Sequence, residues 1–155
     1  MNRRQAVLAV AATIGIGVGA TTTAHLRPPV ARPNVIVTPG AYDPTITQAN
    51  IASTICLPGY TATVRNVSAS VKQRVFTEYH VTPTPGAYEV DHLISLELGG
   101  SNDIRNLWPE PYGGLPPTAH DKDYAENRLH RDLCARRITL ALARALILDP
   151  KQWHK

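Results

Sequence analysis

The pair Asp91-His92 lies in the stretch YEVDHLI, which is followed by Gly99-Gly100 and by Asn106 in the run NLWPEP. A carboxylate supplies a hard oxygen ligand for a divalent cation, and an imidazole that titrates near neutral pH can take a proton from water. Together these groups could hydrolyse a phosphodiester bond with one metal ion. Adjacent residues of a strand point to opposite faces, so the pair can serve both purposes only where the strand bends or ends.

The residues around the pair predict a β-hairpin. Residues 88–94 are rich in β-favouring side chains, Gly99-Gly100 breaks the chain, and residues 104–108 can return as the partner strand. We expect the prolines that begin with Pro109 and Pro111 to stop the sheet.

A helix is predicted after the hairpin, over residues 119–137, with Thr118 as its N-cap. One side of this helix is apolar and should face the core. The opposite side is polar and rich in potential ligands: His120, Asp123, Asn127, His130 and Cys134.

Four further segments have residue patterns that are typical of a helix or a strand. Residues 46–56 suggest a short helix capped by Thr45 or Thr47, and residues 60–67 suggest a strand or extended segment. Ser68 can open a helix that ends near residue 79, and a last amphipathic helix should begin after Thr139 and end before Asp149-Pro150.

The first residues predict export. Residues 1–24 combine Arg3-Arg4 with an uncharged run that is short for a membrane span, which is typical of a signal peptide; an uncleaved N-terminal anchor is the alternative. The Asn-Arg-Arg-Gln opening leaves the twin-arginine route open. Residues 25–44 read as a proline-rich linker and residues 45–155 as one domain. We therefore expect a secreted or cell-envelope monomer with no membrane partner after cleavage.

The charge balance permits a polyanionic partner without demanding one. The net charge is +4, of which Arg3 and Arg4 supply two positive charges that would leave with the signal. The remaining surface is only mildly basic.

Cys56 and Cys134 are the two cysteines of the chain. An even count in an exported protein favours one disulfide between them. Two free buried thiols are the alternative, and a zinc site is less favoured because neither cysteine lies in a C-x-x-C pair.

The motifs TICLPGYTATVR, EVDHLISLELGG, NLWPEP and KDYAENRLHRDLC resemble the HNH endonuclease family, and more narrowly its small exported members in bacteria and phages. The resemblance covers roughly residues 45–148 and implies an α+β fold, a ββα-metal hairpin-plus-helix core surrounded by additional helices. It implies a metal-dependent endonuclease that leaves a 5′ phosphate and a 3′ hydroxyl.

The resemblance also implies roles for individual residues. His92 matches the general base, Asp91 the first metal ligand, and Asn106 the asparagine that orients the His-bearing loop. The last ligand of the simplest spacing falls on Gly114 or Leu115, which have no ligating side chain. His120 is then the best candidate for the second protein ligand, and the alternatives are Asp123, Glu126 and Asn127.

The expected cofactor is one divalent metal ion, Mg²⁺ first, with Mn²⁺, Ni²⁺ or Zn²⁺ as alternatives. The expected partner is nucleic acid, DNA before RNA, and no feature of the sequence reads bases. Four basic residues are the candidate phosphate contacts: Arg105, Lys122, Arg128 and Arg131.

A second function stays open. The chain could be an exported binding or structural domain that keeps a ββα scaffold without turnover, with or without a structural zinc ion held by Asp91, His92 and His120.

Overall fold

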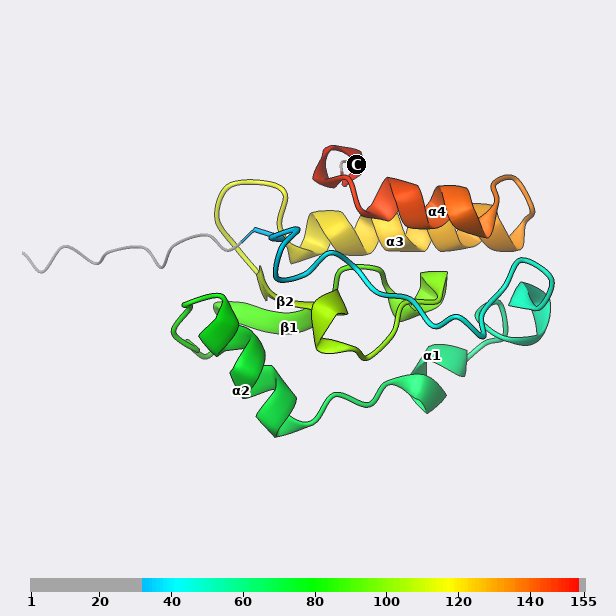
Figure 1. Ribbon diagram of the computed structural model, residues 1–155. Helices are drawn as coiled ribbons and strands as arrows, with labels where there is room; N and C mark the ends of the chain where they lie inside the picture. Colours follow the sequence, from blue (N-terminus) through cyan, green and yellow to red (C-terminus); the bar gives the residue numbers. More distant parts are fainter. Residues whose placement is uncertain (1–31, 154–155) are drawn as a thin grey trace, which may run out of the picture.

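The computed structural model describes residues 32–153 and has an α+β fold (Figure 1). A two-stranded antiparallel sheet lies between two helical layers, with α3 and α4 on one side and α1 and α2 on the other. The strands are β1 (Tyr88–His92) and β2 (Leu107–Pro111); the helices are α1 (Tyr60–Val64), α2 (Ala69–Glu78), α3 (Ala119–Cys134) and α4 (Leu140–Ile147). Short 3₁₀ turns occupy Ile51–Ser53, Leu96–Leu98, Ile104–Asn106 and Pro150–Gln152.

The predicted hairpin is present, but its second strand starts later than expected. Residues Ile104–Asn106 form a 3₁₀ turn, and β2 begins at Leu107. Pro109 lies inside β2, so the expectation that it stops the sheet was wrong, whereas β2 does end at Pro111. β2 is an edge strand of a two-stranded sheet, and a proline is tolerated there because one side of the strand needs no N–H donor.

The helices predicted from their caps are confirmed. Ser68 accepts a hydrogen bond from the N–H of Val71 at the start of α2, and Thr139 accepts one from Leu142 at the start of α4. Thr118 forms a capping box with Asp121 at the start of α3. Each of these side chains satisfies a backbone N–H that has no partner within its helix.

The helix predicted over residues 46–56 was mostly wrong, because only Ile51–Ser53 form a 3₁₀ turn. The Asn50 side chain accepts from the N–H of Thr47 and donates to the carbonyl of Thr45, and the Thr54 hydroxyl donates to the Asn50 carbonyl. These local bonds offer the backbone an alternative to helical hydrogen bonding.

The strand predicted over residues 60–67 was also wrong in its first half. Gly59 takes a left-handed conformation with φ of 81°, and residues Tyr60–Val64 then form the short helix α1. The chain becomes extended at Arg65. Residues 65–67 therefore connect α1 to α2.

Part of the predicted linker, residues 25–44, belongs to the folded domain. The Thr38 hydroxyl is buried and donates to the carbonyl of Leu107, the N–H of Gly40 donates to Arg105, and the N–H of Asp43 donates to Gly99. This segment therefore packs on the hairpin loop and is not a free tether. The signal peptide or anchor predicted over residues 1–24 lies outside the described residues.

The predicted disulfide between Cys56 and Cys134 is present, with 5.7 Å between the Cα atoms. It joins the turn before α1 to the last residue of α3. Trp108 and Trp153 are buried in the core, with ring centroids 6.0 Å apart. Among the described residues, the longest helix falls short of the length and apolar character that a membrane span needs.

Candidate active site at Asp91 and His92

Asp91 and His92 are the last two residues of β1, and their side chains contact different parts of the molecule. Asp91 contacts Lys122 of α3, whereas the ring of His92 contacts Asn102 in the loop between the strands. His92 Nδ1 and Asp91 Oδ1 are nevertheless only 3.8 Å apart. The end of the strand thus allows neighbours that belong to opposite faces to approach each other.

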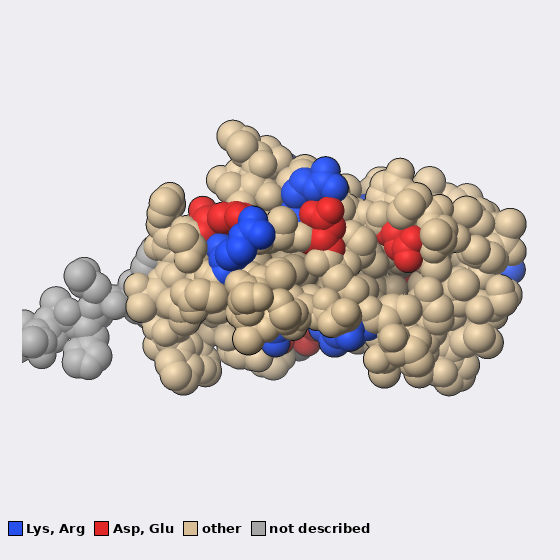
Figure 2. Space-filling view, turned by 60° about the horizontal axis from the view of Figure 1, so that its bottom comes forward, with Lys and Arg blue, Asp and Glu red and all other residues tan. Residues whose placement is uncertain are grey.

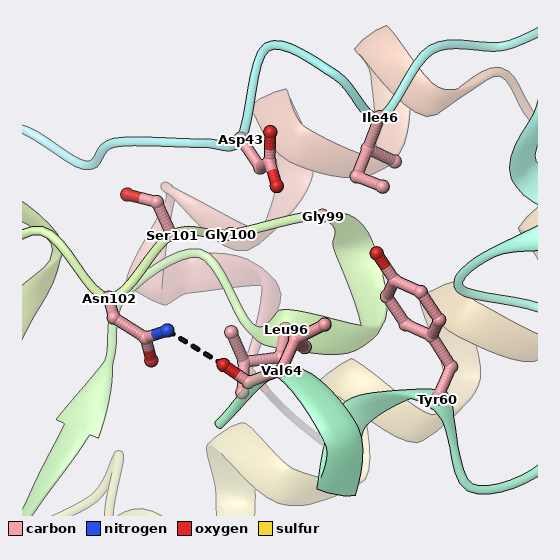
Figure 3. A pocket seen from close by; sticks show the side chains of 9 residues that line it. All are labelled: Asp43, Ile46, Tyr60, Val64, Leu96, Gly99, Gly100, Ser101 and Asn102. Atoms are coloured by element: carbon pink, nitrogen blue, oxygen red, sulfur yellow. Dashed lines mark hydrogen bonds between the residues drawn. The ribbon is translucent and has the colours of Figure 1, made fainter. Parts of the chain in front are cut away.

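Asn102 holds the His92 ring, with 3.0 Å between His92 Nε2 and Asn102 Oδ1. Asn102 Nδ2 donates to the carbonyl of Val64 at 2.8 Å (Figure 3), and Oδ1 also accepts from the N–H of Asn66 at 3.2 Å. These two backbone partners fix which end of the amide carries the oxygen. An amide oxygen can only accept, so Nε2 carries a hydrogen, and in the neutral form of the ring the lone pair would lie on Nδ1.

That lone pair has no protein partner. The His92 side chain is 1% exposed, and within residues 32–153 its Nδ1 atom is buried without a hydrogen bond. A buried nitrogen without a hydrogen bond is costly and needs an explanation. Here Nδ1 faces the Asp91 carboxylate at 3.8 Å.

Asn106 holds the loop that follows His92. Its Oδ1 atom accepts from the N–H of Ile94 at 2.9 Å and of Ala41 at 3.2 Å, and its Nδ2 atom donates to the carbonyls of Ile94 and Ser101 at 2.9 Å. The side chain is fully buried and all of these contacts are to backbone. Asn106 thus ties together both ends of the loop and the N-terminal segment.

Lys122 was predicted to contact nucleic acid, and this prediction was wrong. Its side chain is fully buried, and the Nζ atom lies 2.6 Å from Asp91 Oδ2 and 3.6 Å from Glu110 Oε2. It also bonds Glu126 one turn further along α3. We call Lys122, Asp91, Glu110 and Glu126 the Lys122 cluster. Its ammonium neutralises carboxylates and is not available to a phosphate.

Three carboxyl groups around one ammonium have different affinities for protons. Burial by itself would raise the pKa of Asp91, but the Lys122 ammonium and its hydrogen bond hold that pKa well below its ordinary value. Burial and the neighbouring carboxylates raise the pKa of Glu126 to about 7 and that of Glu110 to about 9. Asp91 is therefore the ionised partner of Lys122, and Glu110 is protonated at neutral pH.

The predicted second ligand, His120, lies on an exposed part of α3, as do the alternatives Asp123 and Asn127. The contacts with the hairpin come from the side of the helix that carries Lys122, and His120 as the second ligand stays a prediction. Among the four candidates, Glu126 reaches the surroundings of Asp91, through their shared contact with Lys122.

The remaining basic residues are placed unequally. Arg105 is committed to Asp103 through two hydrogen bonds of 3.0 and 2.7 Å, and Arg128 donates to the carbonyl of Gln152. Arg131 is exposed. Arg65, which the sequence did not single out, lies with Nη1 3.9 Å from Asp91 Oδ1.

Cys56, His130 and Cys134 place one ligand atom each within 4.8 Å of the others, which is a spacing that could hold a metal ion. The two sulfur atoms are bonded to each other, and His130 Nε2 lies 2.8 Å from the carbonyl oxygen of Ile55. In the oxidised protein this trio is therefore a disulfide with a neighbouring imidazole.

Sequence reasoning missed Asn102, Arg65 and Glu110 as parts of the site. Two signals were available. Lys122 and Glu126 have the i,i+4 spacing of a helical ion pair, and Glu110 interrupts a run of apolar residues and prolines. Asn102 and Arg65 carry no such signal, because their role depends on how the loop and the α1–α2 connection meet.

No protein-family model, no curated protein and no solved structure matches this chain. The resemblance to HNH endonucleases stays a prediction.

Proposed function

We propose that this chain is a metal-dependent endonuclease that hydrolyses phosphodiester bonds of nucleic acid, DNA in the first place. The observation that carries the proposal is the His92 Nδ1 lone pair, buried without a partner, 3.8 Å from the Asp91 carboxylate. A base beside a hard oxygen ligand suits the activation of water next to a divalent ion.

His92 is the proposed general base. Its Nδ1 atom takes a proton from the attacking water, while Nε2 keeps its hydrogen bond to Asn102 Oδ1. The ring becomes positively charged in this step. The nearby Asp91 carboxylate and the Asn102 amide oxygen both stabilise that charge.

Asp91 is the proposed metal ligand, through Oδ1. Lys122 bonds Oδ2 at 2.6 Å, whereas Oδ1 has the exposed side chain of Arg65 at 3.9 Å. An oxygen donor beside an imidazole fits Mg²⁺, Mn²⁺ and the alternative ions. When bound, the ion would stabilise the negative charge that develops on the phosphate. Glu126 bonds Lys122 through Oε1, so its Oε2 atom is the one that would join the ion.

A second candidate function is a non-catalytic binding or structural domain. The observation that favours it is the Lys122 cluster, in which the carboxylate of Asp91 already has a protein cation as its partner. The burial of His92 points the same way, since water must reach Nδ1 before it can be activated.

A cleavage assay separates these functions. The oxidised chain is incubated with supercoiled plasmid and with a single-stranded oligonucleotide, in Mg²⁺, Mn²⁺, Ni²⁺ or EDTA. We expect metal-dependent cleavage that falls about 100-fold or more in His92→Asn, since a general base contributes at least that much.

His80→Asn is the matched control. His80 is exposed on α2's C-terminal side with φ of 52°, a conformation that asparagine tolerates. Its activity should equal that of the wild type. His120→Asn tests the ligand predicted from the sequence, and we expect little loss from this exposed position. A folded wild-type chain that cleaves neither substrate with any metal contradicts the nuclease and leaves the binding domain.

A further inference from the structure

We propose that the hollow lined by Arg65, Asn66, Val67, Lys72 and Val90 binds a backbone phosphate of the nucleic acid. It lies between β1 and the α1–α2 connection and has a volume of about 260 Å³. We call it the Arg65 hollow. This inference rests on the proposed function and assigns that function a substrate subsite.

The Arg65 hollow adjoins both members of the catalytic pair. Arg65 Nη1 lies 3.9 Å from Asp91 Oδ1. The N–H of Asn66 donates to the same Asn102 oxygen that faces His92 Nε2. A phosphate bound to Arg65 in the hollow would therefore lie near the proposed ligand Asp91, as a neighbour of the scissile phosphate would.

The two cations of the Arg65 hollow are exposed, and the guanidinium of Arg65 has only a long ion pair, with Asp91 at 3.9 Å. Lys72 is exposed and forms no ion pair with any residue between 32 and 153, and the Arg65 side chain is 57% exposed. In contrast, Arg74, Arg105 and Arg137 each have a carboxylate within 3.3 Å. No acidic residue lines the hollow. A guanidinium and an ammonium among the residues that line one small hollow suit a phosphate group.

The size of the hollow and the surrounding surface favour a local contact. Pockets for drug-sized ligands have roughly 300–1,000 Å³, so this one suits a phosphate and part of a sugar better than a whole base. Figure 2 brings the side of α1 and α2 forward and shows basic and acidic side chains in small adjacent groups on a mostly uncharged face. We therefore expect a few individual cations, and not a broad basic surface, to bind the nucleic-acid strand.

The test is binding without turnover. The affinity of the full oxidised chain for a fluorescently labelled eight-nucleotide single strand is measured by anisotropy in EDTA, over a range of salt concentrations. We expect Arg65→Gln and Lys72→Gln each to weaken binding about 3- to 10-fold and to reduce the slope of log K against log salt by about 0.7, the value for one phosphate contact on a single strand.

Arg74→Gln and Lys151→Gln are the matched controls, because both side chains are exposed and lie outside the hollow. They should change affinity less than 2-fold. Equal losses in the controls, or no loss in Arg65→Gln and Lys72→Gln while thermal unfolding shows them folded, would overturn the proposal. Saturation of the hollow by an acidic peptide with no binding of the oligonucleotide would overturn it as well.

Inorganic phosphate provides a second readout. In a titration followed by amide NMR, the signals of Asn66 and Val67 should shift in the wild type and stay in place in Arg65→Gln. These measurements need no cleavage, so the two proposals can fail separately. A chain that binds phosphate here without cleaving nucleic acid supports the phosphate site and contradicts only the nuclease. A chain that cleaves nucleic acid but does not bind phosphate here contradicts only the phosphate site.

Discussion

The chemistry of His92 depends on a residue ten positions further along the chain. Asn102 touches no substrate in the proposed reaction, yet its amide oxygen decides which ring nitrogen keeps the lone pair. The orientation of that amide depends in turn on Val64 and Asn66, which belong to a different segment. Asn102 is therefore a positioning residue, whose effect can be separated from a purely structural one.

We predict that Asn102→Ala mixes the two tautomers of His92 and lowers cleavage at least 10-fold, because Nε2 loses its acceptor. Asn102→Asp keeps an acceptor for His92 and should retain the Nε2–H tautomer. The check is the ¹⁵N chemical shifts of the His92 ring, recorded for both variants. Unchanged ring shifts in Asn102→Ala would show that Asn102 does not select the tautomer.

Glu126 should make the stability of the fold depend on pH. Burial raises its pKa from 4.5 to about 7, so between these values the folded chain holds a proton that the unfolded chain releases. The stabilisation is complete below about pH 4.5 and is lost as the pH rises through about 7. The loss is on the order of 3 kcal/mol, because one unit of pKa difference corresponds to about 1.4 kcal/mol.

Glu126→Gln should therefore lose less stability than the wild type between pH 5 and pH 8. We attribute the decline in stability that remains in this variant to Glu110, because its raised pKa also makes stability fall as the pH rises. Urea unfolding at each pH, in EDTA, is the measurement. The same decline in both proteins would rule out Glu126 as its source.

Among the secondary-structure elements, the sequence correctly predicted the helices whose first residue is set by a local capping side chain. Ser68, Thr118 and Thr139 each act through neighbours within three residues, and their helices begin where expected. The region around Asn50 was misread because side-chain hydrogen bonds replaced a helix. The apolar side of α3 faces the core as expected, but the ion pairs that it makes with the hairpin were not foreseen. Lys122 is buried there because carboxyl groups of Asp91, Glu110 and Glu126 surround its ammonium.

The loop between the strands imposes its own requirement, at Gly100. A Cβ atom added there would lie 1.7 Å from the carbonyl oxygen of Ile94, the residue that Asn106 clamps. We predict that Gly100→Ala destabilises the fold by about 3 kcal/mol, the upper end of typical overpacking costs, since backbone must move. Urea unfolding measures this.

Gly113→Ala is the matched control for Gly100→Ala. No atom lies within 4 Å of an added Cβ at Gly113. Its stability should stay within about 0.5 kcal/mol of the wild type, as for other surface changes. Equal stability of the two variants would mean that the loop is not closely packed at Gly100.

For the whole molecule, the Cys56–Cys134 disulfide links the N-terminal half to the end of α3 across 78 positions. We predict that Cys56→Ser with Cys134→Ser lowers the free energy of unfolding by roughly 4 kcal/mol, the chain-entropy value for so long a loop. Urea unfolding of the variant against the oxidised wild type measures the change. The free energy of unfolding of the reduced wild type should match that of the variant. If the reduced wild type instead keeps the stability of the oxidised one, the disulfide does not stabilise the fold.

Lys122 has one more consequence, which concerns how the protein matures. Many small metal-binding domains stay unfolded until their ion binds, because the free energy of metal binding is part of their free energy of folding. Here the chain carries its own positive charge into the middle of the carboxylates. We therefore expect the chain to fold in EDTA, without waiting for an ion to be supplied.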